Sequence, residues 1–148
     1  YKDETKTAST FLVIEGKRYS CPGDFAIVED DGSITLLGRG SVCINTGGEK
    51  VFPEEVEEAL KTHPSVLDAV AVGVPDEKFG EAVTAVVEPR EGAVVAGGEL
   101  IAHVKQTLAA YKAPKHVVEI DTIGRAANGK VDYKRLKGHA SDVLGLSS

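Results

Sequence analysis

VFPEEVEEALKTHPSVLDAVAVGV, residues 51–74, changes from a helical to a strand pattern within one short stretch. Pro53 stands where the first residue of a helix is expected, and the two glutamates after it suit the positive end of a helix dipole. Apolar residues then repeat at the i, i+4 spacing of an amphipathic helix up to Leu60, and Pro64 ends the pattern. Residues 66–74 are apolar and rich in valine, which predicts a buried strand. We therefore expect a helix packed against a sheet.

The alternation of helix and strand continues on the C-terminal side of this stretch. Residues 82–87 predict a second strand, and an apolar stripe after Gly97 predicts a second helix that ends before Pro114. Residues 117–120 predict a third strand, and residues 131–136 a last helical turn or two. The order of elements predicts an α+β fold, in which a small domain has a three-stranded β-sheet flanked by helices.

The N-terminal side has a different pattern, made of short strands and turns. Residues 11–14, 25–28 and 34–37 predict strands. The acidic run with glycine at residues 29–32 predicts the hairpin turn between the last two strands, because glycine supplies the positive φ that such turns need. Glycines then recur from Gly38 to Gly48. The pattern of short strands changes at Gly38-Arg39-Gly40, and the elements from Ser41 onward make up the small α+β domain.

Composition excludes several classes of protein. The net charge of −6 over 148 residues is wrong for a nucleic-acid-binding protein. No apolar run approaches the length of a membrane span, and no secretory signal is present. Two cysteines, Cys21 and Cys43, are too few for a disulfide framework or a zinc cluster and fit a reducing cytoplasm. We expect no metal site among the four histidines, which lack ligand spacing: His63, His103, His116 and His139.

The chain contains no methionine, even at position 1. We therefore expect it to be a piece of a longer protein, and we expect the function to depend on the remainder.

The run GRAANGKVDYKRLK, residues 124–137, has the G-x-x-x-x-G-K spacing of a phosphate-binding P-loop. A P-loop continues with Ser or Thr as a magnesium ligand, but Val131 stands there. Only 18 residues follow Lys130, too few for another strand–helix–strand crossover that would carry the second metal-holding acid. The spacing alone favours a solvated turn at Asn128-Gly129, with Lys130 as a surface charge.

Five stretches in order lead to another interpretation. YSCPGD (19–24) is similar to Y-R-T-G-D, and GRGSVCINTGGEKVFPEEVEEAL (38–60) to G-R-x-x-D-x-I-x-x-x-G-x-x-x-x-P-x-E-I-E. VAVGVPDEKFGEAVTAVV (70–87) is similar to V-x-x-x-P-D-x-x-x-G-E, and LAAYKAP (108–114) to L-x-x-Y-K-x-P. GRAANGKVDYKRL (124–136) is similar to P-R-x-x-x-G-K-x-x-R-x-x-L. Together they cover nearly the whole chain and resemble the adenylate-forming superfamily of acyl-CoA synthetases, luciferase-like enzymes and peptide adenylation domains.

The resemblance implies an enzyme that activates a carboxylic acid with ATP to an acyl-adenylate and then transfers the acyl group to a thiol, commonly that of coenzyme A. It implies ATP, coenzyme A and Mg²⁺ as cofactors, with the metal bound mainly by a large N-terminal domain. Residues 1–38 then correspond to the last strands of that domain, residues 39–43 to the hinge, and residues 44–148 to the mobile C-terminal domain. The phosphate loop with its T-G-x-P-K-G ending is absent, so the fragment alone is expected to be inactive.

Two residues match positions that bind the nucleotide in this superfamily. Asp24 matches the acid that holds the ribose hydroxyls, and a carboxylate can grip a diol with both oxygens. Arg39 matches the arginine beside the ribose and phosphates, where a planar cationic fork fits. Without the resemblance, Asp24 is a turn-capping residue and Arg39 a surface charge.

The hinge and the thiol passage are the next matches. Ser41 falls where the superfamily usually has an Asp or Lys hinge, and Val42 replaces a common second acid. Serine can absorb a change in φ and ψ, but the usual charged contact is missing. Gly47, Gly48 and Glu49 match the loop lining the pantetheine tunnel, where glycine lets a slim thiol arm pass close to the backbone.

Lys130 matches the lysine that enters the active site during adenylation. A compact ammonium on a flexible stem can stabilise negative charge that develops when a carboxylate attacks the α-phosphate. Gly124 and Ala126 depart from the usual Pro and Thr near this lysine. These departures question the rigidity of the loop.

The expected protein is a cytoplasmic acyl-CoA synthetase for a fatty or related lipid acid. Its partners are its own N-terminal domain, the acid and coenzyme A, with no nucleic acid and no transmembrane segment; peripheral membrane association would run through the missing domain. One alternative is an adenylation domain that loads a carrier protein. The other is a non-catalytic interaction module that retains the fold. Asp24, Arg39, Gly48 and Lys130 together favour the enzyme, because a module needs none of them.

Overall fold

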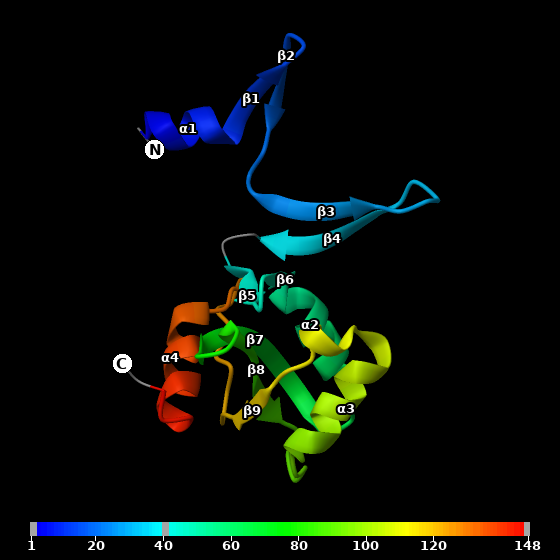
Figure 1. Cartoon of the computed structure of the whole chain (residues 1–148), viewed down its shortest axis with the longest axis vertical. Helices are drawn as coiled ribbons and strands as arrows, with labels where there is room; N and C mark the ends of the chain where they lie inside the picture. Colours follow the sequence, from blue (N-terminus) through cyan, green and yellow to red (C-terminus); the bar gives the residue numbers. More distant parts are fainter. Residues whose placement is uncertain (1–2, 40–41, 147–148) are drawn as a thin grey trace. The chain divides into compact units, whose positions relative to one another are not determined.

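The computed structural model describes residues 3–39 and 42–146 (Figure 1). The chain divides into two compact units, Tyr1–Ser41 and Val42–Ser148.

The first unit contains one short helix and two antiparallel hairpins. Its elements are α1 (Glu4–Thr10), β1 (Phe11–Ile14), β2 (Lys17–Ser20), β3 (Asp24–Val28) and β4 (Ile34–Arg39). The β1–β2 and β3–β4 pairs are antiparallel and form two separate two-stranded sheets. The turn of the second hairpin has Gly32 at φ +82°, and Ser33 N–H donates to Asp31 Oδ1 at 2.9 Å. Strands β1, β3 and β4 and the acidic hairpin turn confirm the predicted pattern, whereas α1 and β2 were not predicted.

The second unit contains a five-stranded sheet with helices on both faces. Its elements are β5 (Ile44–Thr46), β6 (Glu49–Val51), α2 (Pro53–Lys61), β7 (Val66–Asp76), β8 (Gly80–Pro89), α3 (Gly97–Thr107), a 3₁₀ turn (Ala110–Lys112), β9 (His116–Glu119) and α4 (Tyr133–Val143). The strand order is β6-β5-β8-β7, and β9 pairs with β8. The β8–β9 pair is parallel and the other pairs are antiparallel.

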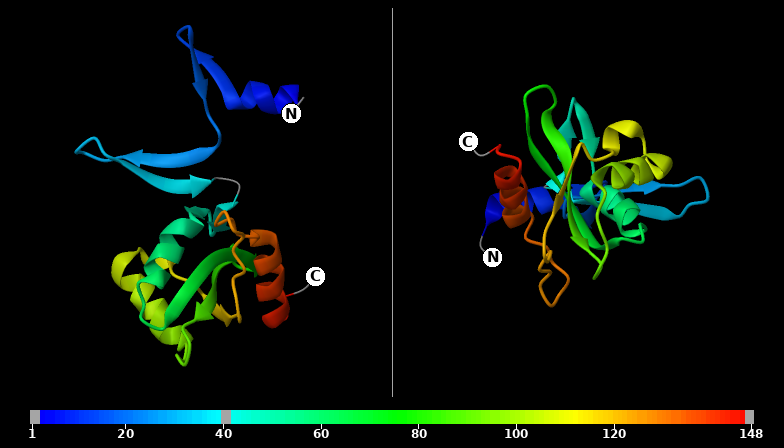
Figure 2. Two further views of the ribbon diagram at one scale, coloured as in Figure 1. Left: turned by 180° about the vertical axis from the view of Figure 1, so that it is seen from behind. Right: turned by 90° about the horizontal axis from the view of Figure 1, so that it is seen from below.

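Strand β7 is buried on both faces, and this explains its continuous apolar sequence. Alternate side chains of a strand point to opposite faces, so Ala69 and Ala71 pack in the core that contains Val56 and Leu60 of α2. The intervening valines pack in a second core that contains Leu136 of α4. Figures 1 and 2 show α2 and α3 on one side of the sheet and α4 on the other. The fold is thus α+β, as predicted.

The predicted number of strands in the sheet was too low. Three strands were predicted, whereas five are present among the described residues of the second unit. The two additional strands are β5 and β6. Each has three residues, and together they form a hairpin in the glycine-rich segment. The hairpin meets β8 at one register pair, Thr46 with Gly80. Such short strands carry too few side chains to show a period-2 pattern.

Helix α4 was also longer than expected, with 11 residues instead of one or two turns. Asp132 caps its start, since Arg135 N–H donates to Asp132 Oδ1 at 3.0 Å. Leu136 and Ala140 lie on its buried face and are fully inaccessible to solvent. Tertiary packing therefore extends a helix whose sequence contains weak helix formers such as Gly138.

Candidate functional site

The two residues predicted to bind the nucleotide lie in the first unit, on adjacent strands. Asp24 begins β3 and Arg39 ends β4, and the antiparallel register places their Cα atoms opposite each other. The β3–β4 hairpin therefore brings an acid and a base from 15 positions apart in the sequence to one end of a sheet.

The predicted hinge residue Ser41 lies outside the described residues. The neighbouring Cys43 is half-buried, and its thiol donates to Val51 O at 3.5 Å. Burial raises the pKa of the Cys43 thiol, so this cysteine is a neutral packing residue at neutral pH.

The predicted thiol passage is the turn of the β5–β6 hairpin. Gly47 and Gly48 have φ values of +59° and +89°, as the two central residues of a type I′ turn require. A Cβ on Gly47 would lie 3.1 Å from Phe79 Cδ1, and Gly47 N–H donates to Phe79 O at 2.8 Å. A Cβ on Gly48 would meet nothing within 4 Å. Gly47 therefore packs the turn onto the β7–β8 connection, while Gly48 leaves an open strip beside it.

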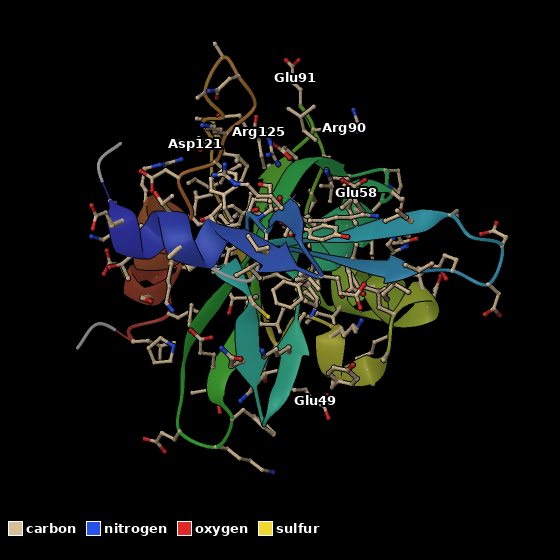
Figure 3. The ribbon with its side chains drawn as sticks, turned by 90° about the horizontal axis from the view of Figure 1, so that it is seen from above. Glu49, Glu58, Arg90, Glu91, Asp121 and Arg125 are labelled. Carbon is tan, nitrogen blue, oxygen red and sulfur yellow. The ribbon has the colours of Figure 1, made fainter. Side chains whose placement is uncertain are left out.

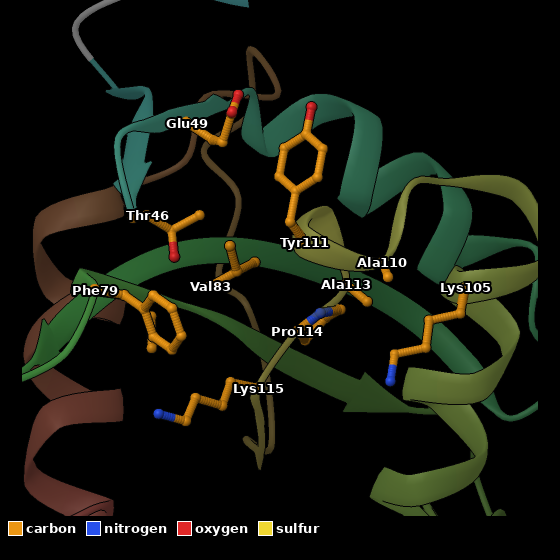
Figure 4. A pocket seen from close by; sticks show the side chains of 12 residues that line it. Thr46, Glu49, Phe79, Val83, Lys105, Ala110, Tyr111, Ala113, Pro114 and Lys115 are labelled. Atoms are coloured by element: carbon orange, nitrogen blue, oxygen red, sulfur yellow. The ribbon is translucent and has the colours of Figure 1, made fainter.

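A pocket of about 450 Å³ adjoins this turn. Figure 4 shows Phe79 and Tyr111 on either side of Val83. Lys115 lies near Phe79, and Lys105 lies on the opposite side of the pocket. The ammonium of Lys115 lies 5.4 Å from the centre of the Phe79 ring. Lys115 also forms an ion pair with Asp76. The pocket thus offers aromatic faces and the ammonium of Lys105 to a ligand that is aromatic and anionic, while the charge of Lys115 is shared with Asp76.

Phe79, Tyr111 and the two lysines of the pocket were not predicted from the sequence to be functional residues. Tyr111 and Pro114 belong to the LAAYKAP stretch, which was quoted as a motif without a role. The signal was therefore present in the sequence. It needed the fold, because the 3₁₀ turn carries Tyr111 to a place beside a hairpin more than 60 residues earlier.

Lys130 lies at the end of a closed turn between β9 and α4. Ala126 N–H donates to Lys130 O at 2.9 Å, and Gly129 N–H donates to Ala126 O at 2.8 Å. Lys130 N–H donates to Asn128 Oδ1 at 3.2 Å. The Lys130 side chain is exposed, and among the described residues its ammonium has no hydrogen-bond or ion-pair partner. The predicted Asn128-Gly129 turn is present, and it presents a lysine whose charge is available to a ligand.

A buried hydrogen bond joins α2 to the start of α4, three residues after Lys130. Glu57 is 5% exposed and accepts hydrogen bonds at 3.1 Å from Ala71 N–H and at 3.1 Å from the Tyr133 hydroxyl. Burial raises the pKa of Glu57 and of Tyr133. Tyr133 stands where the superfamily pattern has arginine. A phenol therefore stands here in place of a cation, and it donates to Glu57 without placing a second charge beside that buried carboxyl group.

Glu81 links the thiol-passage hairpin to α4. Asn45 N–H of β5 donates to Glu81 Oε2 at 3.0 Å, and Lys137 of α4 pairs with Glu81 Oε1 at 2.7 Å. A Cβ on Gly73 would lie 2.8 Å from this carboxyl group, so glycine at 73 leaves room for the link. The hairpin and the helix after Lys130 are thus parts of one hydrogen-bonded framework.

Residues 3–39 and 42–146 contain neither a metal-ligand cluster nor a membrane-spanning helix. No group of three or more His, Cys, Asp or Glu side chains is placed to hold a metal ion. No helix there has the length and apolar character needed to cross a membrane.

The second unit is thus a small α+β domain that carries an exposed lysine on a braced turn and a glycine turn beside an aromatic pocket. The chain belongs to the AMP-binding enzyme C-terminal domain family, whose model matches residues 55–130, about half of the chain. The match ends at Lys130. The resemblance to adenylate-forming enzymes is confirmed.

Individual relatives agree with this family. The chain is 58% identical over 137 residues to the medium/long-chain-fatty-acid–CoA/3-oxocholest-4-en-26-oate–CoA ligase of Mycolicibacterium smegmatis, covering 93% of this chain and 25% of that protein. It is 57% identical over 146 residues to the 3-oxocholest-4-en-26-oate–CoA ligase of Rhodococcus rhodochrous, covering 99% and 26%. The chain therefore spans about a quarter of the length of these curated relatives.

Solved structures share the fold. ATP-bound MatB from Rhodopseudomonas palustris matches with a TM-score of 0.80 and 32% identity over 96% of this chain and 28% of that one.

Proposed function

We propose that this chain is the C-terminal part of an ATP-dependent acid–CoA ligase. Such an enzyme converts a fatty acid or related lipid acid to an acyl-adenylate and then to a CoA thioester. The proposal is supported by identity above one half to ligases named for such acids. The observation that carries it is the unpartnered ammonium of Lys130 on a closed, hydrogen-bonded turn.

Lys130 serves the first half of the reaction. The acid's carboxylate oxygen attacks the α-phosphorus of ATP, an acyl–phosphate bond forms, and pyrophosphate leaves with the electrons of the broken P–O bond. Negative charge grows on the phosphoryl oxygens in the transition state. A mobile ammonium placed against those oxygens stabilises them more than it stabilises the ground state.

We assign the binding of the nucleotide to Asp24 and Arg39. Their opposite places on β3 and β4 would let the carboxylate accept from the ribose hydroxyls while the guanidinium lies near the phosphates. The nucleotide is expected as its Mg²⁺ complex. We assign the magnesium ligands to the remainder of the enzyme, because the described residues bring together no set of three acidic or histidine ligands.

Gly47, Gly48 and Glu49 serve the second half of the reaction, in which a thiol attacks the acyl carbonyl and AMP leaves. The open strip beside Gly48 fits a slim pantetheine arm, since no atom lies within 4 Å of its Cβ position. The adjoining pocket of about 450 Å³ fits the adenine nucleotide end of CoA. Phe79 and Tyr111 offer faces for the base, and Lys105 offers charge for the phosphates together with Lys115, whose ammonium is shared with Asp76.

The remaining assignments concern the whole enzyme. We assign residues 1–38 to the large N-terminal domain, residues 39–43 with Ser41 to the hinge, and residues 44–148 to the mobile domain. The N-terminal domain is the principal partner. We place the enzyme in the cytoplasm, where its substrates ATP and CoA occur together.

The test of the proposed function uses the full-length enzyme with ATP and a panel of acids. The panel contains a medium-chain fatty acid, a long-chain fatty acid, 3-oxocholest-4-en-26-oate and acetate. We expect pyrophosphate release and a CoA thioester with at least one of the first three, and no product from residues 1–148 alone. Absence of acid-dependent pyrophosphate release would refute the proposal. Transfer to a phosphopantetheine carrier protein but not to CoA would replace it with a carrier-loading function.

Tyr111 provides a sharper test of the pocket assignment. Tyr111→Ala in the full-length enzyme should raise KM for CoA roughly 5- to 150-fold, because the stacking of a base on an aromatic ring contributes about 1–3 kcal/mol. The rate of pyrophosphate release without CoA should stay unchanged. Val94→Ala, which alters an apolar residue that is 87% exposed, is the control. An unchanged KM for CoA in Tyr111→Ala would show that the nucleotide end of CoA does not bind in this pocket.

A further inference from the structure

The loop that carries Lys130 is fixed to the sheet by one arginine. The guanidinium of Arg125 donates from Nε to Asp68 Oδ2 at 2.6 Å and from Nη2 to Asp68 Oδ1 at 2.9 Å. This is a two-bond fork between a planar cation and a carboxylate, the geometry that gives an ion pair directional strength. Asp68 belongs to β7, which pairs with β8, so the bond connects the loop to the sheet of the second unit.

The pair is charged at neutral pH and partly shielded from solvent. The side chains of Arg125 and Asp68 are 31% and 19% exposed. Burial acts to raise the pKa of Asp68, but hydrogen bonds from Arg125 and from Ala69 N–H outweigh it and hold that pKa below its usual value. The pair therefore persists throughout the neutral range.

The same guanidinium also reaches the residue before Lys130. Arg125 Nη1 lies 3.5 Å from Gly129 O, a long contact that directs the third nitrogen toward the peptide joining Gly129 to Lys130. Since Ala126 and Lys130 close the turn between them, Arg125 stands at the base of a small ring of backbone. All three guanidinium nitrogens thus face protein atoms.

A second arginine holds the other side of the loop base. Arg135 of α4 donates to Ile123 O, and Ile123 N–H donates to Glu88 Oε2 at 2.6 Å. Gly124 has φ +67°, and a Cβ on it would lie 3.2 Å from Arg135 Nη2. A proline, with φ near −65°, could not adopt this backbone. The chain therefore stiffens the loop through arginine contacts and not through the proline of the family pattern.

We propose that Arg125, paired with Asp68, is a positioning residue for Lys130. It holds the closed turn so that the lysine ammonium has one approach direction, and it does not itself touch the substrate. This inference rests on the proposed function, since it gives Arg125 a role that is exerted through Lys130 in adenylate formation.

The test compares Arg125→Met and Arg125→Lys in the full-length enzyme. Arg125→Met should lower kcat for pyrophosphate release roughly 10- to 100-fold, because a displacement of about 1 Å in a catalytic group has effects of this size. KM for ATP and the rate of thioester formation from a supplied acyl-adenylate should change by less than about twofold. Arg125→Lys keeps the charge but not the fork, so it should give an intermediate loss. Asp68→Asn should reproduce the selective loss from the other side of the pair.

A double-mutant cycle with Lys130 decides whether Arg125 acts by positioning Lys130 or has an independent role. In a Lys130→Ala enzyme, adding Arg125→Met should change the residual adenylation rate by less than about twofold, because its effect has already been lost. If the double variant loses adenylation rate by the product of the two single-variant losses, the proposal is wrong. Equal loss of adenylation and thioester formation in Arg125→Met would also contradict it.

The controls separate this proposal from the proposed function. Arg90→Met alters an exposed arginine whose side chain has no polar partner among the described residues, and it should be silent. If the melting temperature shows that Arg125→Met does not fold, Arg125→Lys carries the same comparison. A normal Lys130→Ala enzyme would refute the proposed function. An impaired Lys130→Ala enzyme with normal Arg125 variants would refute the positioning role alone.

Discussion

Lys130→Ala in the full-length enzyme is expected to slow pyrophosphate release from acid and ATP by about 10²–10³-fold. The lysine is exposed, and its ammonium has no partner in the described part of the chain, so its replacement leaves no buried group unpaired. The loss should therefore fall on the transition state, with the melting temperature unchanged. Thioester formation from a supplied acyl-adenylate should be largely preserved. Rapid-quench measurement of each half-reaction gives both rates.

The control for this variant is Lys134→Ala, four residues later in α4. Lys134 is also exposed and also has no side-chain partner among the described residues, so both half-reactions should proceed normally. Equal loss of both half-reactions in Lys130→Ala would contradict the role given to Lys130. A normal adenylation rate in that variant would contradict it as well.

Gly48→Leu should have the opposite effect and slow thioester formation from a supplied acyl-adenylate by roughly 10²-fold. The position has φ +89° and open space around its Cβ, so a leucine would extend into the strip assigned to the thiol arm. Pyrophosphate release should stay within about threefold of the unmodified enzyme. Stopped assays with synthetic acyl-adenylate and CoA measure the affected step.

A leucine with positive φ also carries backbone strain of roughly 1–2 kcal/mol, which must be separated from obstruction. Gly92→Leu is the matched control, because Gly92 has φ +74° and equally open surroundings in a turn with no assigned role. Gly48→Ala has the same strain with less bulk. If Gly92→Leu and Gly48→Leu slow thiol transfer to the same degree, the passage assignment is wrong.

The elements that could be predicted from the sequence are those with a strong, continuous pattern. Helix α2 begins at Pro53 as expected. Strand β7 extends the predicted strand by two residues at its C-terminal end, and β8 extends its predicted strand by two residues at each end. Hairpin β5–β6 was missed because six residues around two glycines show no periodicity. Helix α4 was underestimated because its stabilising contacts are with the sheet, and local sequence does not show them.

The candidate site divides in the same way. Asp24, Gly48 and Lys130 stand in linear motifs, so their roles could be proposed from sequence. The Asp68–Arg125 and Glu57–Tyr133 contacts join residues 57 and 76 positions apart, and neither partner indicates the other in sequence. The departures at Gly124 and Ala126 questioned the rigidity of the loop, but the arginine contacts that restrain it depend on the fold.

The link through Glu81 has a further consequence for the order of events. Glu81 joins β5 to α4. The glycine turn and the lysine loop are therefore connected within one domain and move together. Figure 3 shows Glu49 of the hairpin and Arg125 of the loop on opposite sides of that domain. Under the proposed function, a single active centre can face one of these sides at a time. When the domain turns the glycine hairpin toward the active centre for thiol transfer, the same rotation must therefore move the Lys130 loop away from it.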